Sequence, residues 1–134
     1  GIRQMIDIEP IVFEAVKSAV SPVKCSPTYQ DRSKVFPLVT VEEHDNSVYE
    51  KTQDSGNIEN HARVLYEVNV YSNLTNGKKS QAKQLIHKVD EVMATMGFVR
   101  SYCSPTPNLA DSTVYRITAR YRAVVDKNKT IYRR

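Results

Sequence analysis

The segment from residue 61 to residue 97 places a strand pattern directly before a helix pattern, and this order most constrains the fold. In "HARVLYEVNVYS" (61–72), every second residue from Val64 to Val70 is apolar, which is typical of a strand with one buried face. After the turn "NLTNG", Gly97 ends a helix over residues 78–96. The apolar stripe of this helix must be buried against another element, such as a sheet. It consists of Ala82, Leu85, Ile86, Val89, Val92, Met93 and Met96.

The longest strand pattern, "TVYRITARYRAVVD" (113–126), separates two faces by their chemistry. Apolar residues and alanines alternate from Tyr115 to Val125, and the positions between them include Arg116, Thr118, Arg120 and Arg122. We therefore expect a sheet with one apolar face toward the helices and an arginine face that points away from the core. "KNKT" then turns the chain into the short tail "IYRR".

The N-terminal part predicts a first helix and two further strands. Residues 7–20 repeat apolar side chains at helical spacing, with Asp7 as the expected N-cap and Pro10 in the first turn. "VKCSPTYQ" (23–30) and "FPLVTVEE" (36–43) read as strands. Pro27 and Pro37 each remove a backbone donor, so these strands are expected at a sheet edge or to end at the prolines.

Together the patterns predict an α+β fold, in which two helices pack on one face of a mostly antiparallel sheet of four to six strands. The 134 residues are the usual size of one domain, so residues 1–134 are expected to form a single domain. Residues 44–60, "HDNSVYEKTQDSGNIEN", have almost no apolar periodicity and are expected to form a long loop.

Composition favours an ordinary folded protein without a membrane segment. Hydrophobic residues make up 40% and charged residues 25% of the chain, which is the usual balance of a soluble domain. Neither a long apolar run nor a secretory pattern at the start is present, so we expect a cytoplasmic protein. Cys25 and Cys103 are then expected to be free thiols.

Residue types that could support catalysis or metal binding gather at one place only, in the run Glu42, Glu43, His44 and Asp45. Consecutive residues of a strand point to opposite faces, so at most two of the four can converge. We interpret the run as a solvated strand end. The four glycines form no phosphate-binding motif. The sequence thus predicts no catalytic residue, no metal, no cofactor and no enzyme activity.

The formal net charge of +4 raises the possibility of a nucleic-acid partner. Lysines cluster in "GKKSQAK" (77–83), and arginines line one face of the strand at 113–126. Aromatic residues are not expected to interleave with this arginine face, as a platform for stacking single strands would need, and neither a helix-turn-helix nor a zinc-finger spacing is present. Sequence-specific DNA recognition is therefore not expected, and the arginine face reads as a solvated or interface surface.

Nearly the whole chain resembles the tail terminator, or tail-completion, proteins of long-tailed bacteriophages. The segments that carry the resemblance are "YEVNVYSN" followed by "GKKSQAK", the helix end "MGF", "PNLADSTVYRITARYRAVV" and the terminal "IYRR". The resemblance implies a small structural virion protein of the tail and neck region. Its subunits form a homo-oligomer, expected to be a hexameric ring, that caps the tail tube and joins it to the head connector.

The resemblance also implies the partners and the place of assembly. The expected partners are the tail tube protein, the head connector or stopper protein, and passing genomic DNA bound without sequence specificity. Assembly would take place in the host cytoplasm. Another head–tail joining component, such as a stopper, an adaptor or a minor capsid protein, stays an alternative. So does a non-specific DNA-binding accessory protein, which would show salt-dependent duplex binding.

Two surfaces are hypothesised to make contacts in such a ring. Arg116, Arg120 and Arg122 are expected to pair with Glu42 or Glu67 on neighbouring strands or subunits rather than to line the lumen. Polar residues of the predicted loop are expected to contact the tail tube or a neighbouring subunit; they are Tyr49, Lys51, Asp54 and Asn57.

Overall fold

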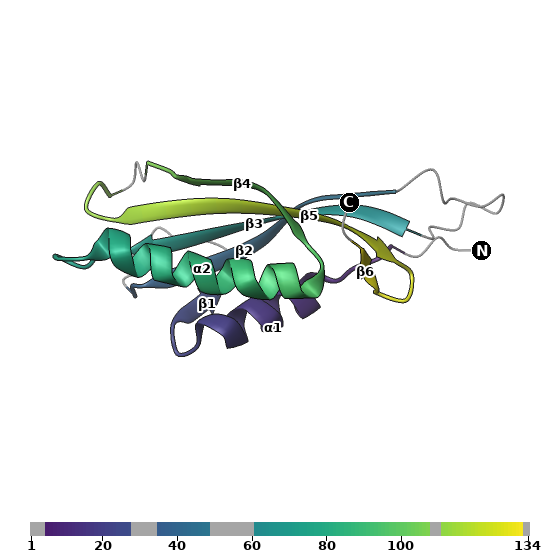
Figure 1. The fold of residues 1–134 in the computed structure, drawn as a ribbon, viewed down its shortest axis with the longest axis horizontal. Helices are drawn as coiled ribbons and strands as arrows, with labels where there is room; N and C mark the ends of the chain where they lie inside the picture. Colours follow the sequence, from purple (N-terminus) through teal and green to yellow (C-terminus); the bar gives the residue numbers. More distant parts are fainter. Residues whose placement is uncertain (1–4, 28–34, 49–60, 108–110, 133–134) are drawn as a thin grey trace.

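The computed structural model describes residues 5–27, 35–48, 61–107 and 111–132. Within these residues, two helices and six strands follow one another (Figure 1). Their order and bounds are α1 (Glu9–Val20), β1 (Lys24–Ser26), β2 (Leu38–Val48), β3 (His61–Ser72), α2 (Lys78–Met96), β4 (Val99–Pro105), β5 (Tyr115–Asp126) and β6 (Ile131–Tyr132).

All six strands belong to one sheet with the order β1-β2-β3-β5-β4, and β6 pairs with the end of β5. The short β1 runs parallel to β2, whereas every other pairing is antiparallel. Both helices lie on the same side of the sheet (Figure 1). The predicted α+β fold class, with two helices on one face of a mostly antiparallel sheet, is therefore confirmed.

The first helix begins two residues later than predicted. Ile8 occupies the N-cap position, and the Asp7 carboxylate accepts a hydrogen bond of 3.0 Å from the backbone N–H of Glu9. Asp7 thus satisfies a free N–H of the first turn without being the N-cap itself. Of the apolar side chains that repeat at helical spacing, Val12 and Val16 are fully buried together with Val20, whereas Ile11 is 43% exposed, so only part of the predicted stripe of α1 faces the core.

Helix α2 has the predicted bounds because a glycine caps it at each end. Gly77 and Gly97 have φ angles of 92° and 108°, values that side chains other than glycine rarely adopt. Beyond Gly97, the N–H of Phe98 donates to the carbonyl of Met93 at 3.0 Å, as in a Schellman motif. Phe98 is then buried with its ring edge-on to Tyr66.

The two helix-flanking glycines give a matched test of this end of α2. A Cβ on Gly97 would lie 3.1 Å from the carbonyl oxygen of Ile131, whereas a Cβ on Gly77 meets nothing within 4 Å. Strain in the backbone should cost each alanine variant about 1 kcal/mol, and the added contact should bring Gly97→Ala to about 2 kcal/mol. Urea unfolding of both variants measures the difference. Equal losses would show that β6 yields to the extra methyl group.

The predicted loop at residues 44–60 is wrong over residues 44–48, because β2 continues through Val48. A β-bulge between Glu43 and Asp45 shifts the register, and pairing with β3 resumes from Asp45 to Val48. Backbone hydrogen bonds to β3 hold this end of β2, while its side chains are mostly exposed and polar. Apolar periodicity therefore cannot reveal it. The remainder of the predicted loop lies outside the described residues.

The predicted strand at residues 23–30 is short in the structure. Only Lys24–Ser26 forms β1, and residues 28–30 are outside the described part of the chain. Pro27 follows β1 and Pro37 precedes β2, so both prolines stand at strand ends as predicted. Neither of the described helices has the length and apolar character needed to cross a bilayer.

The apolar core lies between the two helices and the sheet. Tyr66 and Tyr121 are its largest fully buried side chains. Their hydroxyl groups donate to carboxylates beside the core, Tyr66 to Glu43 at 2.7 Å and Tyr121 to Asp90 at 3.0 Å. Burial and these acidic acceptors raise the pKa of both phenols, so each stays protonated and keeps donating.

Candidate functional site: the helix-free face of the sheet

We name the sheet face opposite α1 and α2 the helix-free face. It carries the polar residues of β5, the strand that contains the arginines. Register pairs Glu67 of β3 with Arg120 of β5, Asn69 with Thr118, and Tyr71 with Arg116. On the other side of β3, the same pairing places Leu38, Thr40 and Glu42 of β2 on this face. No helix of the described residues covers it (Figure 1).

Glu67 lies at the centre of this face and is only 8% exposed. Arg120 donates from Nε to one of its carboxylate oxygens at 3.1 Å, and Asn69 donates from Nδ2 to the other at 3.1 Å. His44 places its Nε2 atom 3.5 Å from the same oxygen that Asn69 contacts. A nearly buried carboxylate is thus held by three neighbouring side chains, which its burial requires.

Two opposing effects set the pKa of Glu67. Burial alone would raise it, but hydrogen bonds from Asn69 and Arg120, together with the charges of His44 and Arg120, outweigh burial and hold the pKa below its ordinary value. The ionised carboxylate is therefore the form that the fold favours. Its partners therefore stabilise the sheet more when Glu67 is ionised than when it is neutral.

This lowered pKa gives a pH-dependent contribution to stability. A carboxylate with a lowered folded-state pKa stabilises the protein above its unfolded pKa, and the contribution is lost as the pH falls through the folded-state pKa. We expect the difference in unfolding free energy between the wild type and Glu67→Gln to be largest near neutral pH. It should shrink below the ordinary value of 4.5. Urea titrations at a series of pH values test this, and a difference that stays constant into acid would contradict it.

Glu42 faces Glu67 directly in the register of β2 and β3. Like charges in such a pair repel, and His44 lies between them, with Nε2 3.5 Å from Glu42 Oε2 and 3.5 Å from Glu67 Oε2. Glu43 turns to the opposite face, where Tyr66 and Asn46 donate to its carboxylate. Glu42 and His44 meet and Glu43 diverges, so two of the four residues 42–45 converge, within the predicted limit. The β-bulge pairs Asp45 with Leu65 and so turns it to the face of Glu42, but Asp45 accepts from Ser47 Oγ at 2.8 Å instead.

A second row of polar groups lies beside Glu67. The Asn69 side-chain oxygen accepts from Thr118 Oγ1 at 2.6 Å and from Arg116 Nε at 2.9 Å. Thr106 extends the row by donating from Oγ1 to Thr118 Oγ1 at 2.8 Å. Asn69 and Thr118 are 4% and 3% exposed. Within the described residues, no group of His, Cys, Asp and Glu is arranged to hold a metal ion.

Tyrosines from neighbouring strands stack on two of the arginines. The guanidinium carbon of Arg120 lies 5.0 Å from the ring centre of Tyr102 in β4, and that of Arg116 lies 5.6 Å from the ring centre of Tyr71 in β3. Both distances are within the range of a cation–π interaction. The expectation that aromatic residues do not interleave with the arginine face is therefore wrong, because the tyrosines come from other strands.

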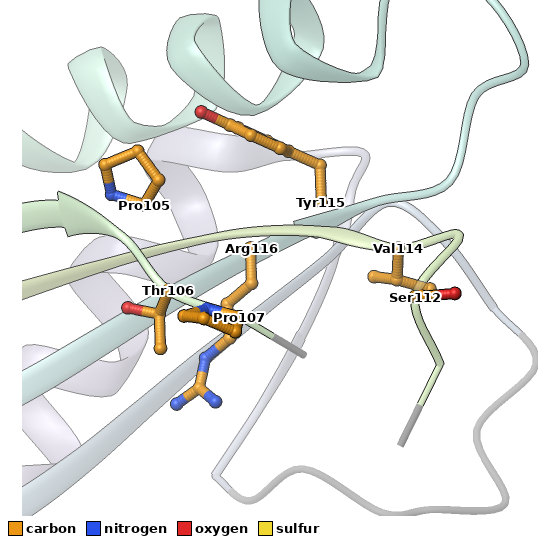
Figure 2. A pocket seen from close by; sticks show the side chains of 7 residues that line it. All are labelled: Pro105, Thr106, Pro107, Ser112, Val114, Tyr115 and Arg116. Carbon is orange, nitrogen blue, oxygen red and sulfur yellow. The ribbon is translucent and has the colours of Figure 1, made fainter. Parts of the chain in front are cut away.

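The two stacked arginines are also fixed at Nε. Asn69 accepts from Arg116 Nε, and Glu67 accepts from Arg120 Nε. Figure 2 shows the Arg116 side chain leaving β5 on the side opposite to Tyr115, with its guanidinium group away from the strand. An arginine held by a hydrogen bond and a ring loses less conformational entropy when it binds a partner.

The structure brings together some of the hypothesised interface residues and separates others. Arg120 pairs with Glu67 on the neighbouring strand of the same chain, as predicted. Arg116 contacts an amide rather than an acid, and Arg122 is exposed on the same face. Glu42 contacts His44 instead of an arginine. The loop residues Tyr49, Lys51, Asp54 and Asn57 lie outside the described residues.

Sequence reasoning missed several members of this face. They are His44, Asn69, Tyr71 and Tyr102, whereas Thr118 was placed on the arginine side by the alternation of its strand. Tyr71 and Asn69 are at alternate positions with Glu67 in β3, so the period of that strand placed them on the arginine side. The register between β3 and β5 decides which arginine each of them contacts. The alternation within a single strand does not specify this register.

Two grooves flank β4. One, of about 510 Å³, lies where the ends of β4 and β5 diverge and is lined by Pro105, Thr106, Pro107, Ser112, Val114, Tyr115 and Arg116 (Figure 2). The other, of about 350 Å³, lies on the helix side between α2 and β4, and its lining includes Lys83, His87 and Arg100. Asp90 in this groove pairs with Arg100 at 3.0 Å.

The two cysteines differ in their surroundings. Cys25 lies in β1 and Cys103 in β4, at opposite edges of the sheet. Burial raises the pKa of Cys25 to about 11, with a smaller lowering effect of Lys17 and a smaller raising effect of Glu14. Cys103 is exposed.

Thiol reactivity should follow this difference, because the thiolate is the reactive form. At pH 8 we expect iodoacetamide to modify Cys103 at least about tenfold faster than Cys25. Mass spectrometry of peptides at successive times measures both rates in one sample, and Cys103→Ser provides the control for assignment. Equal rates would show that β1 opens readily.

Comparison with known proteins adds no family to this description. No protein-family model matches the chain, and no curated protein matches its sequence.

Proposed function

We propose that this chain is a structural, non-catalytic subunit of the phage neck that acts as a tail terminator. In this function its copies form a hexameric ring that caps the tail tube and meets the head connector. The resemblance of the segments "YEVNVYSN", "GKKSQAK" and "PNLADSTVYRITARYRAVV" supports the assignment. The α+β fold that the resemblance implies agrees with the observed one.

The helix-free face is the observation that carries the proposal furthest. Arg116 and Arg120 are each stacked on a tyrosine and held by a side-chain acceptor. Tyrosine and arginine are the residues most enriched in protein–protein interfaces, where they contribute much of the binding energy. A face built in this way suits a subunit that functions by contacting its neighbours, the tail tube and the connector.

The mass and symmetry of the purified chain test the proposal. Light scattering over a range of concentrations, with negative-stain images of the same sample, should give closed rings. Added to tubes of the tail tube protein from the same phage, the rings should bind at tube ends and stop further growth. A chain that stays monomeric at all concentrations and does not bind tube ends would contradict the proposal. Rings that bind only the head connector would favour a stopper.

A DNA-binding accessory protein is the second candidate, and the arginine–tyrosine pairs favour it. Such pairs offer phosphate contacts beside rings on which bases stack. This function would give duplex or single-strand binding whose affinity falls steeply with salt. Fluorescence anisotropy at several salt concentrations separates the two candidates. Micromolar DNA binding by a monomer, together with no binding to tube ends, would support the second candidate.

A further inference from the structure

The outer edge of β4 is open, whereas the outer edge of β2 is already occupied. Along β2, the N-terminal segment of the same chain is bonded to the strand: Glu9 accepts from the backbone N–H of Glu43 at 3.1 Å, and Asn46 donates to the carbonyl of Ile6 at 2.7 Å. At the other end of the sheet, β4 pairs with β5 alone, and no hydrogen bond from another described segment reaches the backbone of residues 99–104 on its outer side. Unpaired strand edges are templates for pairing with an extended chain.

The centre of β4 lacks the charges that commonly protect such an edge. Arg100 turns to the helix side, where it pairs with Asp90 at 3.0 Å. A register shift between Arg100 and Tyr102 bounds the stretch on one side, and Pro105 ends β4 on the other. Residues 102–104 between these features carry no charge and are exposed or half-buried. They offer a short stretch of backbone to which another strand can pair.

The groove of about 350 Å³ between α2 and β4 lies beside this stretch. The apolar part of its lining is nearly buried, with Ile86 of α2 5% exposed and Ile117 of β5 4% exposed. A strand added to β4 would point every second side chain to the helix side of the sheet, toward this groove. Peptide-recognition sites use the same combination, in which main-chain hydrogen bonds provide affinity and pockets for alternate side chains provide specificity.

The cations that line the groove are not equivalent. Arg100 and Asp90 neutralise one another, and Asp90 also accepts from the hydroxyl of Tyr121 at 3.0 Å. Lys83 and His87 are exposed on α2, and among the described residues neither side chain has an acid within ion-pair distance. The groove therefore combines an apolar lining with one uncompensated lysine charge. A carboxylate is the group that complements this charge.

We propose that the edge of β4 and the groove beside it bind an extended peptide segment of a partner protein, which carries an apolar side chain and an acidic side chain two residues apart. The apolar side chain packs against Ile86 and Ile117, and the acidic one reaches Lys83. The spacing of two residues follows because both side chains must leave the added strand on the same face. This inference goes beyond the proposed function. It concerns the helix side of β4 rather than the helix-free face, and it does not require that the copies form rings.

A peptide array probed with the labelled full chain tests the predicted chemistry. The probes are synthetic peptides of seven residues, the length of β4, in which two positions separated by one residue take every pair of natural residues in both orders. We expect the strongest binding where one position is apolar and the other acidic. Binding no stronger than that of scrambled peptides would overturn the inference.

A charge reversal at Lys83 identifies the residue that selects the acid. Lys83→Glu should weaken binding of the best peptide by about tenfold or more, because it places like charges together, and should shift the preferred residue from acidic to basic. Lys88→Glu makes the same change at an exposed position of α2 outside the groove lining, and it should bind the array like the wild type. A preference for acids that persists in Lys83→Glu would contradict the assignment.

Filling the groove tests its role without a change of charge. Cys103 is exposed and lines the groove from β4. Cys103→Trp should therefore weaken binding of the best peptide by about tenfold, whereas Cys103→Ser should bind like the wild type. Fluorescence anisotropy of the labelled peptide measures both variants. If Cys103→Trp does not fold, the change of preference in Lys83→Glu still decides the question.

The thiol of Cys103 also reports where the peptide binds. A saturating concentration of the best peptide should slow the modification of Cys103 by iodoacetamide by about fivefold and leave the rate of Cys25 unchanged in the same sample. An unchanged rate at Cys103 would show that the peptide binds elsewhere, which would overturn the inference.

Two further outcomes separate this inference from its alternatives. Self-association of the chain that both Lys83→Glu and Cys103→Trp abolish, together with no binding on the array, would make a second copy the occupant of the groove and overturn the peptide. A wild-type chain that forms no rings and does not bind tube ends, but binds the predicted peptides, would overturn the tail-terminator function and support the peptide site.

Discussion

Tyr66→Ala is expected to lower the free energy of unfolding by about 3–5 kcal/mol, the usual cost of removing a large aromatic side chain from a core. Tyr66 is fully buried at the centre of β3 and packs edge-on against Phe98, with ring centres 5.7 Å apart. The cavity would open between β3 and Phe98, which follows the end of α2. Urea unfolding at neutral pH measures the loss.

Tyr66→Phe is the matched control because it keeps the ring and removes only the hydroxyl group. Glu43 then loses the hydrogen bond that Tyr66 donates at 2.7 Å, which should cost about 1 kcal/mol. The difference between the two variants isolates the packing of the ring. A loss of less than about 1 kcal/mol for the alanine variant would show that the site collapses around the cavity.

Arg120→Glu is expected to cost about 2–3 kcal/mol, below the usual range for a fully buried pair because the arginine is partly exposed to solvent. The change removes the hydrogen bond from Nε to Glu67 and places a third acid beside Glu67 and Glu42. Glu67 is 8% exposed, so water cannot screen the repulsion well. Urea unfolding of the purified chain measures the loss.

The double variant Arg120→Glu, Glu67→Gln separates repulsion from lost contacts. A neutral glutamine at position 67 removes the buried charge, so part of the stability should return. If Arg120→Glu alone leaves both stability and assembly unchanged, the ion pair does not stabilise this face. If stability is kept but assembly is lost, Arg120 contacts a neighbouring subunit.

The elements with strong local patterns could be predicted, and those held only by backbone pairing could not. Helix α2 has the predicted bounds because its stripe and Gly97 are local signals. The end of β2 was missed because its side chains are polar and mostly exposed, whereas its order comes from pairing with residues 62–65 of β3. A pattern of side chains cannot report a hydrogen bond made by the backbone.

The sequence by itself determined which faces are apolar, where the helices stop, and that the arginines of β5 lie opposite the core. It could not determine their partners. Glu67 and Arg120 are 53 residues apart in the chain, and alternation in a strand fixes the face of a side chain but not the residue opposite it. Only the tertiary structure sets that register, because it depends on how β3 and β5 both pack their apolar faces under the same helix. The stacking of Arg116 on Tyr71 and the burial of Glu67 beside Arg120 both follow from it.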